Sequence, residues 1–118
     1  MATQTLHGSC HCGAVAYEVE ADPESAISCN CSICSRLGAL WVFAPKSKFK
    51  LSKGRDELGD YQFNKRILHH RFCRHCGVES FAEGKGKDGS EQVGINLRCV
   101  PAIDVNKLSP KQVDGRSR

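Results

Sequence analysis

Cysteine is the residue type that offers this sequence most of its chemistry. The chain has 118 residues and eight cysteines, and all but one of the eight lie within three residues of another cysteine. They form the clusters Cys10-His11-Cys12, Cys29-Asn30-Cys31-Ser32-Ile33-Cys34 and Cys73-Arg74-His75-Cys76, while Cys99 stands alone. A disulfide between cysteines one residue apart would be strained, whereas neighbouring thiolates can bind one metal ion through bonds of about 2.3 Å. The spacing therefore favours metal binding over disulfide formation.

Two of these clusters are pairs that a glycine follows. Cys73-x-x-Cys76 has the spacing of a zinc knuckle, in which the glycine permits a tight turn. One knuckle supplies two ligands and a closed structural site needs four, so the second pair must be Cys10-x-Cys12. Zinc is the usual ion in tetrahedral thiolate sites, although iron is chemically feasible. We predict a structural zinc ion bound by Cys10, Cys12, Cys73 and Cys76.

The remaining cluster places three thiolates, those of Cys29, Cys31 and Cys34, within six residues. Three protein ligands with one open position are typical of catalytic zinc sites. Cys99 could instead be the fourth ligand, and both zinc sites would then be closed and structural. The spacing leaves both arrangements open, and we expect the open one. Histidines near the clusters are weaker candidate ligands, because each is more often an ordinary surface or half-buried residue: His11, His69, His70 and His75.

An open zinc site with three thiolates suits thiol chemistry. Three negative ligands outweigh the charge of Zn²⁺ and weaken it as a Lewis acid. An incoming thiol would lose its proton on binding and could attack an electrophilic carbon, such as that of an aldehyde, and the reverse reaction would cleave a carbon–sulfur bond. Arginines near the clusters could bind the carboxylates of such a substrate, or could merely offset the negative charge of the sites. The leading candidates are Arg36 and Arg98, and the other candidates are Arg71 and Arg74.

The elements that must position these residues are predicted to be short strands. Aromatic and β-branched residues alternate with polar ones over 14–20, 40–43, 49–51, 60–63, 68–72 and 92–97. Turn residues separate these segments, and 32–37 could form one helical turn. Leu, Ile, Val and Phe make up about a fifth of the chain, which is near the lower limit for a globular core, so metal sites should help to hold the fold. The pattern predicts a mostly β domain with zinc at its turns.

The length fits one domain over residues 1–118, with a polar tail over 104–118 that we expect at the periphery. The first residues lack the features of a secretory leader, and the longest apolar run is far too short to span a membrane. We therefore expect a cytoplasmic protein without membrane contact, in a compartment that keeps thiols reduced. The net charge of +4 comes from intermixed acidic and basic residues and does not indicate a nucleic-acid partner.

Several segments together resemble a known family. They are 8–13 (GSCHCG), 28–34 (SCNCSIC) followed by 36–38 (RLG), 72–77 (FCRHCG), 94–99 (GINLRC) and 114–115 (DG). Over about residues 6–115, the chain resembles the glutathione-dependent formaldehyde-activating enzyme family, which includes centromere protein V. Three ordered cysteine clusters make this a specific signal.

The resemblance implies a small antiparallel β domain of the β-tent type that binds two zinc ions. It gives the four-cysteine group a structural zinc ion and the three-cysteine group a catalytic one, which agrees with the grouping from spacing. It also implies a carbon–sulfur lyase that forms or cleaves an adduct between glutathione, or a similar thiol, and a small electrophile such as formaldehyde. The alternative is a non-catalytic binding or chaperone-like module in which both zinc ions are structural.

The grouping predicts different effects of single cysteine substitutions. Cys73→Ser should cost the structural metal and much of the fold together, because structural zinc binding is coupled to folding. Cys34→Ser should remove one zinc ion and leave more of the fold intact. Elemental analysis of zinc per chain and thermal unfolding followed by circular dichroism measure the two effects. Equal loss of stability in both variants would contradict the distinction between a structural and a catalytic site.

Overall fold

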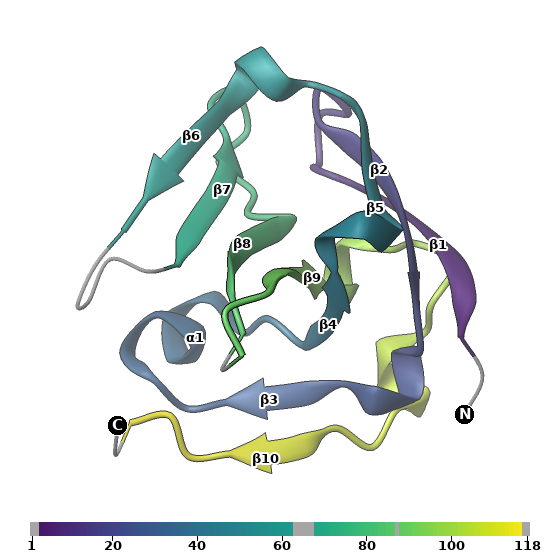
Figure 1. Ribbon diagram of the computed structural model, residues 1–118, viewed down its shortest axis with the longest axis vertical. Helices are drawn as coiled ribbons and strands as arrows, with labels where there is room; N and C mark the ends of the chain where they lie inside the picture. Colours follow the sequence, from purple (N-terminus) through teal and green to yellow (C-terminus); the bar gives the residue numbers. More distant parts are fainter. Residues whose placement is uncertain (1–2, 63–67, 87, 117–118) are drawn as a thin grey trace.

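The computed structural model describes residues 3–62, 68–86 and 88–116, and most of its regular structure is β (Figure 1). The strands are β1 (Gln4–Ser9), β2 (Ala16–Ala21), β3 (Ile27–Cys29), β4 (Trp41–Pro45), β5 (Phe49–Lys53), β6 (Leu58–Tyr61), β7 (His69–Cys73), β8 (Phe81–Lys85), β9 (Glu91–Asn96) and β10 (Lys111–Val113). The described residues contain one α-helix, α1 (Ser32–Leu37), and short 3-10 turns at η1 (Pro23–Ser25), η2 (Lys46–Lys48), η3 (Arg55–Glu57), η4 (Leu97–Cys99) and η5 (Val105–Lys107). The prediction of a mostly β domain is confirmed, and the helical turn lies at 32–37 as expected. Phe63, at the end of one predicted strand, lies outside the described residues.

The strands form two sheets that lean toward each other. The three-stranded sheet has the order β1-β2-β5, and the seven-stranded sheet has the order β10-β3-β4-β9-β8-β7-β6. Neighbouring strands are antiparallel, except that β10 runs parallel to β3 at one edge. Figure 1 shows β2 and β5 rising on one side and β6 and β7 on the other, so that the sheets converge at the top. Within the described part of the chain, no helix is long and apolar enough to cross a membrane.

The hydrophobic core lies between the two sheets. Alternation along β2 and β9 turns Tyr17, Val19, Val93 and Ile95 inward, and each of these is almost fully buried. The ring of Tyr17 packs edge-on against Phe81 with centroids 5.7 Å apart. Burying an aliphatic or aromatic side chain of this size stabilises a fold by about 1.5–3 kcal/mol. In β2 the predicted alternation therefore places one face of the strand in the core.

Tyr17 also joins the sheets through a buried hydrogen bond. Its hydroxyl donates to the main-chain carbonyl of Ser80, just before β8, at 2.9 Å. Burial raises the pKa of the Tyr17 phenol, so the hydroxyl stays neutral and can donate. Gly8 on β1 leaves room for this ring, because a Cβ at that position would lie 2.4 Å from it. The polar link between the sheets thus depends on a glycine in the neighbouring strand.

The C-terminal strand β10 forms one edge of the seven-stranded sheet, where hydrogen bonds join it to β3. β10 pairs with β3 so that Lys111 lies opposite Ile27 and Val113 lies opposite Cys29. The Lys111 N–H donates to the carbonyl of Ala26 at 3.0 Å. The tail therefore runs beside the strand that leads into the three-cysteine cluster.

Tyr17→Phe tests the link between the sheets. We expect the free energy of unfolding to fall by about 1–2 kcal/mol, because the buried Ser80 carbonyl loses its donor while the ring packing stays. Urea unfolding measures the change. Tyr61→Phe is the matched control, since Tyr61 is 50% exposed and surface changes usually stay within about 0.5 kcal/mol. Equal effects of the two substitutions would contradict a structural role for the Tyr17 hydroxyl.

Candidate metal centre

The four-cysteine cluster lies where a turn from each sheet meets the other. Cys10 and Cys12 follow β1, Cys73 ends β7, and Cys76 lies in the turn after it. The four sulfur atoms lie within 4.8 Å of one another, and Cys12 Sγ is 3.7 Å from Cys10 Sγ and 3.6 Å from Cys73 Sγ. All eight cysteines lie in the described residues and are free thiols. Tetrahedral zinc with bonds of about 2.3 Å separates its sulfur ligands by about 3.8 Å, so these four residues fit a zinc ion.

Main-chain N–H groups point at the sulfur atoms of this cluster. The Val15 N–H donates to Cys10 Sγ at 3.4 Å, and the His75 N–H donates to Cys73 Sγ at 3.3 Å. Both sulfur atoms belong to buried cysteines. Donors aimed at a buried sulfur favour the thiolate, which is the form that binds metal. These turns therefore reverse the direction of the chain and also place N–H donors against negatively charged cysteine ligands.

The pKa of Cys76 also favours the thiolate form, which is the form that binds metal. Hydrogen bonding from the main chain of Cys12, and next from that of Val78, lowers the pKa of Cys76 to about 6. The Gly77 that follows has a φ of 79°, a left-handed conformation that glycine adopts without strain. At neutral pH the Cys76 sulfur is therefore a thiolate, held at a turn that glycine makes possible.

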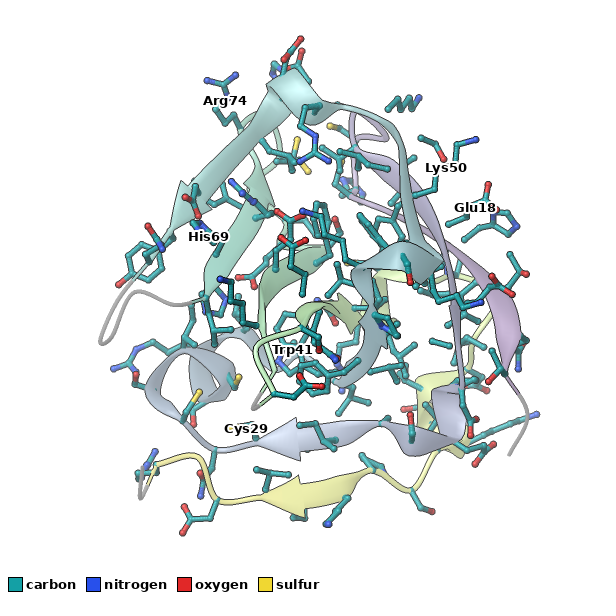
Figure 2. The ribbon with its side chains drawn as sticks, viewed as in Figure 1. Glu18, Cys29, Trp41, Lys50, His69 and Arg74 are labelled. Atoms are coloured by element: carbon teal, nitrogen blue, oxygen red, sulfur yellow. The ribbon has the colours of Figure 1, made fainter. Side chains whose placement is uncertain are left out.

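The three-cysteine cluster lies at the start of α1, at the opposite end of the molecule. Cys29 ends β3, Cys31 immediately precedes α1, and Cys34 lies within the helix. Their sulfur atoms lie within 4.8 Å of one another. Cys34 is buried, while Cys29 and Cys31 are half-buried. In Figure 2 the label of Cys29 lies at the lower end of the molecule and that of Arg74, in the knuckle, lies at the top.

Two N–H groups also point at sulfur atoms in this cluster. The Cys31 N–H donates to Cys29 Sγ at 3.4 Å. The indole N–H of Trp41, on β4, donates to Cys34 Sγ at 3.3 Å. Trp41 is 4% exposed, so its donor is shielded from water and acts on that sulfur. The cluster has the thiolate-stabilising surroundings of a metal site, with three protein ligands.

The thiols of Cys31 and Cys34 differ in acidity. Burial raises the pKa of Cys34 to about 12, and the neighbouring Cys31 adds to this effect. Burial also acts to raise the pKa of Cys31, but hydrogen bonds from the main chain and side chain of Cys34, from Cys29 and from the main chain of Ile33 together outweigh it and lower that pKa. The metal-free cluster therefore keeps a proton on Cys34, which a bound cation would displace. The three sulfur atoms fit a zinc ion that has one coordination position left for another ligand.

Cys99 lies near the four-cysteine cluster. Its Sγ is 3.9 Å from the main-chain carbonyl oxygen of Glu79. Burial, together with the charges of Cys10 and Cys76, raises the pKa of the Cys99 thiol to about 11. Among the described residues, the three-cysteine cluster gathers without it. This position does not suit Cys99 as the fourth ligand of the three-cysteine site, because its surroundings belong to the other end of the fold.

The two leading arginines both lie around α1, the helix that carries Cys34. The Arg36 guanidinium donates to the Ser32 carbonyl at 2.7 Å, and the Arg98 guanidinium donates to the Gly38 carbonyl at 2.8 Å. Both side chains belong to exposed residues. Two cationic residues that lie far apart in the sequence thus contact the same short helix, one at its first residue and one just after its end.

The other two candidate arginines make different contacts. Arg71 forms an ion pair with Glu83, with Nε 2.8 Å from the carboxylate, and a longer one of 3.7 Å with Asp60. Arg74 donates to the main-chain carbonyl of Asp56 next to the zinc knuckle. Arg71 therefore links neighbouring strands of the seven-stranded sheet, and Arg74 makes its contact in the turn that carries Cys73 and Cys76.

The histidines near the clusters do not join them. Three have carboxylate partners: His69 with Asp60, His70 with Glu79 and His75 with Glu57. His11 is exposed. Within the described ranges, the groups of residues able to hold a metal ion contain cysteines alone.

Sequence reasoning missed two contributors to the three-cysteine cluster. Trp41 reads as an ordinary core aromatic of a strand, and its distance of seven residues from Cys34 gives no sign that its indole N–H reaches that sulfur. Gly115 lies so close to Cys29 that a Cβ there would come within 2.4 Å of Cys29 Sγ. The 114–115 pair resembles the family pattern, but spacing alone cannot place it at the cluster.

The fold and the two clusters define a small, mostly β domain with cysteine sites that fit metal ions. Comparison with known proteins agrees: the family model described as glutathione-dependent formaldehyde-activating enzyme matches residues 5–113. The chain belongs to this family.

A crystal structure of a Rhodobacter sphaeroides protein is similar to this chain throughout. The two sequences are 33% identical, the match covers 91% of this chain and 98% of that one, and the TM-score is 0.79. The fold described above is therefore shared with an experimentally determined structure over nearly its whole length.

Metal affinity at the three-cysteine cluster should fall as the pH falls. A cation must displace the proton that the raised pKa keeps on Cys34, and each displaced proton lowers the apparent affinity about tenfold per pH unit. Chelator competition on the zinc-loaded protein, between about pH 8 and about pH 5.5, measures this. We expect release in two phases with the three-ligand site first, because the four-cysteine site holds its ion with one more thiolate. A single phase for both ions at every pH would contradict the difference between the sites.

Proposed function

We propose that this protein catalyses the reversible addition of glutathione, or a similar thiol, to formaldehyde or another small aldehyde at the Cys29–Cys31–Cys34 cluster. The observation that carries the proposal is the difference between the clusters. One gathers four sulfur atoms and the other gathers three. A closed set of ligands suits a structural ion, and an incomplete one suits an ion that binds a substrate. Membership of the family gives the expected substrate class.

The reaction adds a thiol across a carbonyl group. The S–H bond breaks, the sulfur forms a bond to the carbonyl carbon, and the carbonyl oxygen takes up a proton to give a hydroxyl group. The reverse reaction cleaves the carbon–sulfur bond and makes this a lyase. Zinc bound to three thiolates would lower the pKa of the incoming thiol and hold it as a nucleophilic thiolate.

The chain contributes by fixing the three sulfur atoms and their charge. Trp41 donates to Cys34 from a position shielded from water, and the Cys31 N–H donates to Cys29. These donors withdraw negative charge from the cluster, so that a further thiolate is repelled less when it approaches. A cytoplasmic location suits a site made of free thiolates, because thiols stay reduced there.

Arg36 and Arg98 are the proposed contacts for the substrate carboxylates. Glutathione carries two carboxylates, and a guanidinium binds a carboxylate through paired charge-assisted hydrogen bonds. The Arg36 guanidinium donates to the Ser32 carbonyl in α1, and the Arg98 guanidinium donates to the Gly38 carbonyl just after α1, the helix that carries Cys34. The two arginines could therefore orient a thiol substrate toward the cluster.

The alternative, a non-catalytic module with two structural zinc ions, requires four protein ligands at each ion. In the described part of the chain only three candidate ligands gather at the second cluster, and Cys99 lies near the first. The alternative therefore has less support than the catalytic proposal.

Exchange NMR with ¹³C-formaldehyde and glutathione tests the proposal. We expect the zinc-loaded protein to accelerate adduct formation over buffer, and Cys34→Ser to abolish the acceleration because it removes a ligand of the open site. Cys99→Ser is the matched control and should keep the activity. A protein that holds two zinc ions and gives no acceleration would contradict this substrate class. Equal losses in the two variants would contradict the assignment of the site.

A further inference from the structure

The C-terminal segment pairs with the edge of the seven-stranded sheet and also lies against the three-cysteine cluster. β10 lies beside β3 (Figure 1), and Val113, its last residue, is paired with Cys29. Residues 114–116 then continue past the cluster. The segment therefore contacts the cluster as well as the edge of the sheet.

Asn30, the residue between the first two cysteines of the cluster, is held by this segment on two sides. Its N–H donates to the Val113 carbonyl at 3.2 Å. Its side-chain Oδ1 accepts a hydrogen bond from the Arg116 N–H at 2.9 Å. The two bonds bracket 114–115 along the tail, so the segment is fastened before and after Gly115. The loop that carries Cys29 and Cys31 is thereby fixed to a segment more than 80 residues away in the sequence.

Gly115 lies directly against the sulfur of Cys29. A Cβ at position 115 would lie 2.4 Å from Cys29 Sγ and 3.1 Å from the Cβ of Cys31. Favourable contacts between heavy atoms lie near 3.5–4.0 Å, so any side chain would force the sulfur or the tail to move. Gly115 does not have a positive φ, so the position requires glycine for space and not for its backbone conformation.

We propose that residues 113–116 are a positioning element of the three-cysteine metal centre, in which Gly115 lets the chain close on Cys29 and Asn30 fastens it there. The inference rests on the proposed function only in taking this cluster as the metal-binding active site. The tail acts through Cys29: Gly115 packs against its sulfur, which also accepts a 3.4 Å hydrogen bond from the Cys31 N–H, and so restricts the motion of this ligand. Closing of the tail and tight metal binding are therefore coupled.

Gly115→Val and the milder Gly115→Ala test the role of space. Gly86→Ala is the matched control, because a Cβ at Gly86 would meet its neighbours at ordinary contact distances of 3.4 Å or more. We expect elemental analysis to give two zinc ions per chain in the wild-type protein and in the control, and close to one in Gly115→Val. With Co²⁺ in place of zinc, the sulfur-to-cobalt absorption of the three-cysteine site should be lost or shifted while that of the four-cysteine site stays.

Asn30→Ala provides a second test in a variant that inserts no bulk into the site. It removes the acceptor for the Arg116 N–H, and we expect one of the two metal ions to reach a chelator about tenfold faster, as when an outer support of a metal ligand is removed. Two tightly held ions in Gly115→Val, or unchanged release from Asn30→Ala, would overturn the inference. Loss of both ions together in these variants would also overturn it, because the role would not be specific to one centre.

These readouts use the metal alone. A failure of the inference therefore shows in metal content and cobalt spectra, whereas a failure of the proposed function shows as a missing acceleration in a protein with both ions bound. The two outcomes can be told apart in the same set of preparations.

Discussion

The convergence of four cysteine sulfur atoms, placed so that one metal ion could bind them all, is the constraint on which the rest of this structure depends. Without a cation, four sulfur atoms within 4.8 Å of one another repel each other as soon as they lose their protons. With one, they join the two turns at which the sheets converge. Cys10 and Cys73 lie in the same buried cluster as Leu6, Val15 and the rest of the hydrophobic core, so the metal site extends that core. A chain with few large aliphatic residues gains in this way a cross-link that packing alone would not supply.

The second cluster applies the same chemistry with one ligand fewer and with support from more distant parts of the chain. Its sulfur atoms depend on Trp41 from β4, on the start of α1 and on the C-terminal segment. The four-cysteine site is made by two local turns that face each other. The four-cysteine group therefore lies where the sheets meet, whereas the three-cysteine group also takes contacts from Gly115 and Arg116.

Much of this could be predicted from the sequence, because cysteine spacing and period-two alternation are local signals. The grouping of Cys10 and Cys12 with a knuckle some sixty residues away followed from ligand counting. The strands β2, β4, β5, β6, β7 and β9 followed from their apolar alternation, whereas β1, β3 and β8 were not predicted. The parallel pairing of β10 could not be predicted, because a strand of three residues, two of them polar, is too short to show an alternation that specifies its partner strand. The Trp41 donor and the position of Cys99 depend on side-chain direction across the fold. Such contacts become visible only when the tertiary structure is known.

Trp41 is the one tryptophan of the chain, and its indole nitrogen lies 3.3 Å from the sulfur of Cys34. A sulfur anion this close to an excited indole quenches its emission by electron transfer, and a protonated or ion-bound sulfur quenches it to a different extent. The tryptophan fluorescence of the protein therefore comes from a single ring in contact with the three-cysteine cluster. This gives the molecule an optical signal of the chemical state of that sulfur, which needs no label and has no background from other tryptophans.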